Sequence, residues 1–127
     1  MKKHILGMVT VCFAMVVAFA GFASAGDAGK GEGVFKGKGQ CKNCHKLDDK
    51  NSVGPGLKGV TARHNDEWLG KWLADPQKTW EGNDADVQKL KTWKPGRDKA
   101  AKTAMKIPAL SAEEVADLIA FLHQNDK

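Results

Sequence analysis

The chain has 127 residues, of which 20 are Lys or Arg and 15 are Asp or Glu, so its formal net charge is +5 at pH 7. The two signs are interspersed, and a charge this small and this mixed argues against a nucleic-acid-binding protein. A chain of this length suits one small domain rather than several.

The first 25 residues have the pattern of an export signal. A short basic start is followed by an apolar run over residues 5–22, and Ala-Ser-Ala at 23–25 is a small-x-small site of the kind that signal peptidase cleaves. We therefore predict a signal peptide at 1–25 and a mature domain at 26–127. The alternative is a retained membrane anchor, because the apolar run approaches the length that spans a bilayer.

The first mature segment, residues 27–39, suits a helix capped by Asp27. It contains five glycines, and each costs about 1 kcal/mol relative to alanine in a helix. Such glycines make sense where another backbone must come close. Residues 41–63 then read mostly as loop, because glycine and proline interrupt them repeatedly.

Residues 65–76 are predicted to form a clear helix. Asn65 or Asp66 caps this helix, and Pro76 ends it. Its apolar face repeats at i, i+1, i+4 and i+5, which is helical spacing. The residues of this face are Trp68, Leu69, Trp72 and Leu73.

The rest of the chain is predicted to contain one strong helix and two weak ones. Residues 84–93 and 96–104 suit short helices. Ser111 and Glu114 form a capping box that opens the terminal helix. An apolar stripe at helical spacing follows: Val115, Leu118, Ile119 and Leu122. No period-two strand pattern is convincing, so an all-α domain is predicted.

Residues 40–47, Gln-Cys-Lys-Asn-Cys-His-Lys-Leu, hold both cysteines of the mature chain. A disulfide oxidoreductase would need this motif within a βαβ pattern, and the flanking strands are missing. A structural zinc site needs four ligands, but the other mature histidines, His64 and His123, lie far apart. A plain disulfide is the simplest option for an exported protein.

Covalent haem attachment is the interpretation that also uses the histidine. C-x-x-C-H is the attachment signature of c-type haem. Two intervening residues let one helical turn present Cys41 and Cys44 to one edge of the porphyrin, where each thiol adds to a vinyl group. His45 then projects over the ring and can bind the iron. We predict one haem c, attached through both thiols.

The second axial position decides the class of function. An open position would allow gas binding or peroxide chemistry, whereas a filled one favours electron transfer. Met105, the only methionine of the mature chain, stands in a lysine-flanked loop before Pro108, where the backbone is expected to be extended. The rivals are His64, expected at the surface or at a haem carboxylate, and His123, expected in the last helical turn. Met105 is the predicted second ligand, opposite His45.

With these motifs in place, residues 27–126 resemble a small class I cytochrome c. Gly31 and Phe35 match the family's N-terminal helix, and "ADLIAFL" at 116–122 matches its C-terminal helix. The resemblance implies about four to five helices wrapped around one covalently bound haem, with the N- and C-terminal helices crossing at a glycine. Residues 77–104 do not match the family pattern closely.

The resemblance also implies how the haem is held. Residues 53–63, "VGPGLKGVTAR", resemble the family's haem-proximal loop. By that match the Pro55 carbonyl accepts a hydrogen bond from the His45 ring and fixes its orientation. Leu57 packs on the porphyrin, and Arg63 pairs with a propionate.

The stretch from Met105 into the terminal helix resembles the family's methionine loop, which supports Met105 as the second ligand. Trp72, Trp80 and Trp93 are candidates for a hydrogen bond to a propionate. Core packing is the simpler expectation for each of these tryptophans.

We therefore predict a soluble periplasmic electron carrier, a monomer without enzyme activity of its own. The alternatives are a haem-based binder or sensor of small ligands and a membrane-anchored redox subunit of a larger complex; contact with a membrane is expected only if the signal is uncleaved. Lysines beside the site are expected to steer redox partners with acidic docking surfaces. These are Lys36, Lys38, Lys42, Lys46 and Lys106.

Overall fold

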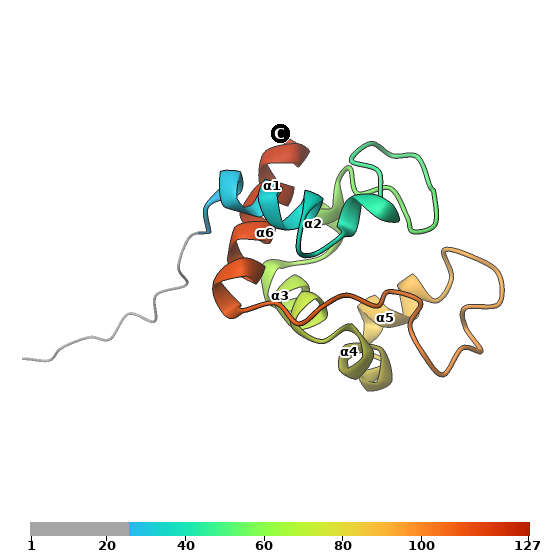
Figure 1. Ribbon diagram of the computed structural model, residues 1–127. Helices are drawn as coiled ribbons and strands as arrows, with labels where there is room; N and C mark the ends of the chain where they lie inside the picture. The colour runs from blue at the N-terminus through green and yellow to red at the C-terminus, as the bar shows by residue number, and fades with distance from the viewer. Residues whose placement is uncertain (1–25) are drawn as a thin grey trace, which may run out of the picture.

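A computed structural model of the protein describes residues 26–127, and the predicted export signal at 1–25 lies outside the described residues. The described chain is helical without a strand, which confirms the all-α prediction (Figure 1). Its elements are α1 (Ala28–Lys36), η1 (Cys41–Asn43, a 3₁₀ turn), α2 (Val60–Arg63), α3 (Asp66–Ala74), α4 (Pro76–Gly82), α5 (Ala85–Leu90) and α6 (Ala112–Asp126). The count exceeds the expected four to five helices because α2 and α4 are short helices that no periodic pattern marks. None of the helices in this part of the chain is long and apolar enough to cross a membrane.

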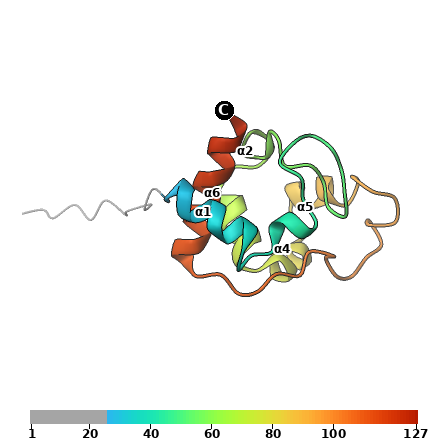
Figure 2. The same cartoon turned by 45° about the horizontal axis from the view of Figure 1, so that its top comes forward.

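The two terminal helices, α1 and α6, cross in close contact and form the most extensive helix pair of the described chain (Figures 1 and 2). Gly31 lies at the crossing, where an added Cβ would sit 1.9 Å from the carbonyl oxygen of Asp117. The rings of Phe35 and Phe121 pack beside it with their centroids 5.4 Å apart. The Asp117 carboxylate also accepts a hydrogen bond from the backbone N–H of Asp27 at 2.7 Å. The expected crossing at a glycine is therefore present.

α3 begins after Asn65, whose side-chain oxygen accepts a hydrogen bond from the backbone N–H of Trp68 at 2.8 Å. All members of its predicted apolar face are buried: Trp68, Leu69, Trp72 and Leu73. Pro76 does more than end this helix, because it is the first residue of α4, a position where a missing N–H is tolerated. Asp75 caps α4 by accepting from the backbone N–H of Lys78 at 3.0 Å. The sequence analysis did not predict α4.

The prediction of a helix at 96–104 is wrong, because tertiary hydrogen bonds hold this stretch as a loop. The indole N–H of Trp80 donates to the carbonyl of Ala100 at 2.9 Å. The side-chain oxygen of Gln77 accepts from the backbone N–H of Thr103 at 3.1 Å. These bonds use backbone groups that a helix would pair internally.

The other two helices follow the predictions. α5 lies inside the predicted range 84–93 and is capped by Asp84. α6 opens with the predicted capping box: the Ser111 hydroxyl accepts from the backbone N–H of Glu114 at 3.1 Å, and the Glu114 carboxylate accepts from the backbone N–H of Ser111 at 2.8 Å. The apolar stripe of α6 faces the core, with Val115, Leu118 and Leu122 buried and Ile119 packed against them.

Gly31→Ala is expected to lower the free energy of unfolding by about 1–3 kcal/mol, because the added methyl group would overlap the α6 backbone and force the two helices apart. Gly33→Ala is the matched control, since nothing lies within 4 Å of a Cβ built at that position of the same helix. The control should raise stability by up to about 1 kcal/mol, because alanine is the better helix former. Guanidinium unfolding of the purified proteins measures both values, and equal effects of the two substitutions would contradict the crossing.

Candidate haem-binding site

A cavity of about 980 Å³ lies within the helical frame, a size typical of cofactor pockets. Every helix of the described chain, the 3₁₀ turn included, contributes to its wall, together with the loop before α2 and the segment after α5. All the residues that the sequence analysis assigned to the site line this cavity: Cys41, Cys44, His45, Pro55, Leu57, Arg63 and Met105.

The turn η1 brings the two cysteines to the cavity wall. The backbone N–H groups of Cys44 and His45 both donate to the carbonyl of Cys41, at 3.1 and 2.9 Å, which makes one tight helical turn. Cys41 is buried, Cys44 is exposed, and both are free thiols rather than a disulfide. Burial raises the pKa of the Cys41 thiol, so this group is neutral near pH 7. Both sulfurs are available for bonds to a ligand.

The His45 ring is held by the loop that follows it. Its Nδ1 lies 2.8 Å from the carbonyl oxygen of Pro55, which is the contact implied by the family resemblance. A carbonyl only accepts, so Nδ1 carries the proton and Nε2 keeps a free lone pair. Gly54 packs against the ring, because a Cβ there would lie 2.5 Å from His45 Cε1. The sequence analysis gave Gly54 no role, although a glycine directly before the proline was the available signal.

Arg63 braces the same loop from α2. Its guanidinium donates to the carbonyl oxygens of Lys58 at 2.7 Å and Gly56 at 3.1 Å. These bonds occupy the side chain for which the resemblance implied a propionate partner, and that pairing stays a prediction. Leu57 is half-buried and packs against the hydrophobic core.

Met105 lies half-buried on the cavity wall in the loop before α6, and Trp72 contacts its sulfur. The indole nitrogen of Trp72 is 3.1 Å from Met105 Sδ, in donor geometry. The backbone N–H of Met105 donates to the hydroxyl of the buried Thr103 at 3.1 Å. The sequence analysis considered Trp72 for a propionate or for plain core packing, and its partner in the structure is the thioether sulfur.

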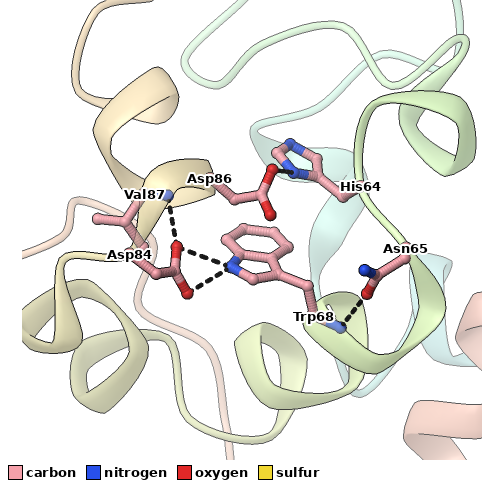
Figure 3. Close-up of polar contacts among 6 residues, drawn as sticks. All are labelled: His64, Asn65, Trp68, Asp84, Asp86 and Val87. Carbon is pink, nitrogen blue, oxygen red and sulfur yellow. Dashed lines mark hydrogen bonds and ion pairs between the residues drawn. The ribbon is translucent and has the colours of Figure 1, made fainter.

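The two rival histidines have other partners. Of the two places expected for His64, the surface is wrong: the residue is 8% exposed, lines the cavity, and places Nδ1 3.1 Å from an Asp86 carboxylate oxygen (Figure 3). Contact with a haem carboxylate stays a prediction. Its ring stacks on Trp68 with the centroids 4.3 Å apart. His123 is exposed on α6, lies outside the cavity wall, and pairs with Asp66, with Nε2 2.7 Å from the carboxylate.

Two carboxylates of the α5 region join that helix to α3. Asp84 accepts both the indole N–H of Trp68, at 3.0 Å, and the backbone N–H of Val87, at 2.9 Å, while Asp86 contacts His64 (Figure 3). Trp68 in turn stacks on Trp72 with the ring centroids 5.3 Å apart. A row of aromatic rings therefore runs along the wall from His64 to the tryptophan that contacts Met105. Sequence reasoning missed this network because its members are up to 22 residues apart.

Burial lowers the pKa of His64 below its usual value, and the hydrogen bond and charge of Asp86 act in the opposite direction. The positive charges of Arg63 and Lys89 lower it further. His64 is therefore neutral at pH 7, and its protonation is disfavoured in the folded protein.

The residues present fit a covalently held haem. The donor set is two free thiols, one imidazole with a defined lone pair and one thioether, all on the wall of one cavity. The surrounding wall is largely apolar and aromatic, as a porphyrin requires: Phe35, Leu57, Leu69, Trp72, Leu118 and Leu122. The fold and this donor set define a class I monohaem c-type cytochrome.

The chain belongs to the cytochrome c family, because the family model described as Cytochrome c matches residues 28–126. The cytochrome c2 of Blastochloris viridis is 34% identical over 133 aligned residues, which cover 98% of this chain and 94% of that protein. The cytochrome c2 of Rhodopseudomonas palustris is 44% identical over 63 residues, 50% of this chain and 42% of that protein. The cytochrome c-type cyt cy of Rhodobacter capsulatus is 55% identical over 38 residues, 30% of this chain and 18% of that protein.

The chain therefore spans less than half the length of two of these relatives and nearly all of the third. No solved structure matches the chain significantly.

His64→Gln is expected to reduce the loss of stability on acidification. As pH falls through about 6.5, the unfolded histidine binds a proton while the folded one, with its lowered pKa, stays neutral, so the free energy of unfolding falls. Glutamine removes this term. Asp86→Asn should enlarge the loss, because it removes the charge that favours protonation of His64 in the folded state. Guanidinium unfolding between about pH 7.5 and about pH 5 measures the slopes, and identical slopes for wild type and His64→Gln would contradict the assignment.

Proposed function

We propose that the protein is an exported, periplasmic electron carrier that passes single electrons through one haem c. In this proposal Cys41 and Cys44 would hold the haem by thioether bonds, and His45 and Met105 would bind its iron. The observation that carries the proposal is the meeting of these four side chains on one cavity wall, although they come from opposite ends of the domain. Membership of the cytochrome c family supports it.

Haem c, when bound, supplies an iron that changes its charge by one without changing its ligands. The chain's own residues set the conditions for this change. The Pro55 carbonyl orients the His45 imidazole and leaves Nε2 free to bind metal. The apolar wall excludes water and disfavours the more highly charged oxidised state, because burial penalises charge. The oriented imidazole and the dry wall would keep the site in one geometry while an electron enters and leaves.

Met105 and Trp72 act together in this proposal. A thioether ligand favours the reduced state and raises the reduction potential. The indole N–H of Trp72 points its positive end at the Met105 sulfur. This contact withdraws electron density from the sulfur and disfavours the extra positive charge of the oxidised centre, so it raises the potential further.

The proposal is tested by intact mass and absorbance of the exported protein. We expect the mass of residues 26–127 plus one haem that acidified organic solvent does not extract. The oxidised protein should show the weak far-red band of sulfur–iron ligation. Met105→Ala should abolish this band, because it removes the thioether. A colourless protein, or a pigment that solvent extracts, would contradict the proposed function.

Trp72→Phe is expected to lower the reduction potential, because phenylalanine keeps the aromatic packing but cannot donate to the Met105 sulfur. Trp80→Phe is the matched control, since it removes an indole N–H that donates to the carbonyl of Ala100 and not to sulfur. Potentiometric titration of the two variants measures the effect. If both variants shift the potential equally, the contact between Trp72 and Met105 has no special role.

A second candidate function, a haem-based binder of small ligands, has one observation in its favour. Met105 borders a second cavity of about 380 Å³ as well as the main one, so its side chain has space on more than one side. In this case the thioether would yield its position to an incoming molecule. Rapid carbon monoxide binding by the reduced protein would favour this function over the carrier.

The surface lysines favour redox proteins with acidic docking surfaces as partners. Lys36 pairs with Glu32, and Lys38 pairs with Glu114 at 2.9 Å, so these two are less available than the sequence analysis expected. The other lysines beside the site enter no ion pair within residues 26–127: Lys42, Lys46 and Lys106. A rate of oxidation by ferricyanide, an anionic reagent, that does not change with ionic strength would contradict electrostatic steering.

A further inference from the structure

The cavity wall carries an excess of positive charge. One of its lining residues, Asp49, is acidic. The basic lining residues are Lys58, Arg63, Lys89, Lys94, Arg97 and Lys106. Five of these six residues are exposed to solvent and Arg97 is half-buried, so water screens their charges, but together they make the rim of an otherwise apolar cavity positive. The wall therefore fits a ligand that is apolar over most of its surface and negatively charged at an edge.

Two of these cations already have hydrogen-bond partners in the protein, and a third lies next to the proposed iron ligand. Arg63 donates to two carbonyls of the loop before α2. The ammonium group of Lys58 donates to the carbonyl of Asn125 at the end of α6. Lys106 is the chain neighbour of Met105, the proposed iron ligand. Arg63 and Lys58 are therefore less free to bind an anion, and Lys106 lies beside the proposed iron ligand rather than at the far edge of the ligand.

The remaining three cations, Lys89, Lys94 and Arg97, come from one stretch of chain, residues 89–97. None of their side chains enters a hydrogen bond or an ion pair with any residue between 26 and 127. The neighbouring acids Asp84 and Asp86 are already engaged with the α3 side of the wall (Figure 3). The 89–97 segment thus places three cations without a partner in the described chain at the cavity, of which Lys89 and Lys94 are exposed to solvent and Arg97 is half-buried.

A neutral donor lies in the same segment. The indole N–H groups of the other tryptophans are occupied: Trp68 by Asp84, Trp72 by Met105 and Trp80 by Ala100. Trp93 lines the cavity, is half-buried, and its indole N–H has no partner in the part of the chain that the structure describes. It is the one tryptophan with a donor left for a ligand.

The 89–97 segment is held at both ends, so these donors have a defined position. Before it, Asp84 and Asp86 fasten α5 to the aromatic wall. After it, the Ala100 carbonyl accepts from Trp80 and the Thr103 N–H donates to Gln77. Within it, the Arg97 N–H donates to the carbonyl of Lys94 at 3.3 Å, which closes a turn. Figure 1 shows α5 in the lower part of the molecule, beside α4 and below the teal turn η1 that carries the cysteines.

We propose that Trp93, Lys94 and Arg97, with Lys89 beside them, bind the two propionate carboxylates of the haem. The inference rests on the proposed function, because it requires a haem in the cavity. The haem carboxylates lie away from the vinyl groups that bind cysteine, so an edge opposite η1 is where anions are expected. Guanidinium and ammonium groups form the strongest hydrogen bonds to carboxylates in proteins, and an indole N–H adds a neutral donor.

The test uses the haem-loaded protein and a double variant, Lys94→Gln with Arg97→Gln. Opposite charge near a carboxylate lowers its pKa by about one unit or more, so the variant should raise the propionate pKa by that amount, as followed by NMR of the propionate protons. The reduction potential should fall, because the removed cations no longer disfavour the oxidised iron. It should also depend more on pH, because the propionates would then titrate closer to neutral pH. Lys99→Gln is the matched control, since Lys99 is exposed in the same loop and does not line the cavity.

Trp93→Phe and Arg97→Lys separate hydrogen bonding from charge. Trp93→Phe should raise the propionate pKa less than the double variant does, because it removes a neutral donor and no charge. Arg97→Lys should keep the reduction potential near that of the wild type, because it keeps the positive charge. Equal propionate pKa values in wild type, the double variant and Lys99→Gln would overturn the inference. If the salt dependence of electron transfer nevertheless changed in the double variant, the cations would be assigned to binding a protein partner instead. The unaltered haem mass and far-red band in all these proteins would then show that the proposed function stands while this inference fails.

Discussion

The close crossing of α1 and α6 is the constraint on which the rest of the structure depends. Because Gly31 has no Cβ, the two backbones meet at the carbonyl of Asp117. α1 leads directly into η1, and the loop that carries Met105 leads directly into α6. The crossing therefore fixes where the cysteine segment begins and where the loop that carries Met105 ends. The far end of α6 also holds the proximal loop, since Asn125 donates to the carbonyl of Leu47 at 2.9 Å and Asp126 accepts from the N–H groups of Gly59 and Thr61.

The two sides of the site are held in different ways. On the His45 side, main-chain groups position the ligand: the Pro55 carbonyl orients the ring, and Gly54 lets the loop lie against it. On the Met105 side, side chains position the ligand: the Trp72 indole donates to the sulfur, and a row of stacked rings runs from Trp72 to buried His64. The Pro55 carbonyl can orient the ring with little dependence on side-chain identity, whereas one substitution can alter the side-chain network around Met105. The Met105 side is accordingly where we expect the reduction potential to be adjusted.

The region between α4 and Met105 separates acidic from basic side chains at the cavity wall. Asp84 and Asp86 face Trp68 and His64, whereas Lys89, Lys94 and Arg97 line the cavity, so one short stretch of chain both completes the wall and supplies positive charge to it. The two roles depend on each other, because Asp84 and Asp86 fix the helix from which the basic segment continues. This separation of charge has no counterpart in the periodic pattern of the sequence.

The sequence by itself determined the features that act within about one helical turn. The Cys-x-x-Cys-His turn, the caps at Asp27, Asn65 and Ser111, and the apolar faces of α3 and α6 each involve residues a few positions apart, so local chemistry specifies them. Tertiary structure decided the contacts between distant residues. Burial of His64 needs Asp86, the loop at 96–104 needs the Trp80 indole, and the Met105 sulfur meets Trp72 from 33 residues away. No spacing in the sequence encodes these pairs, because they form only once the helices have packed around a common cavity.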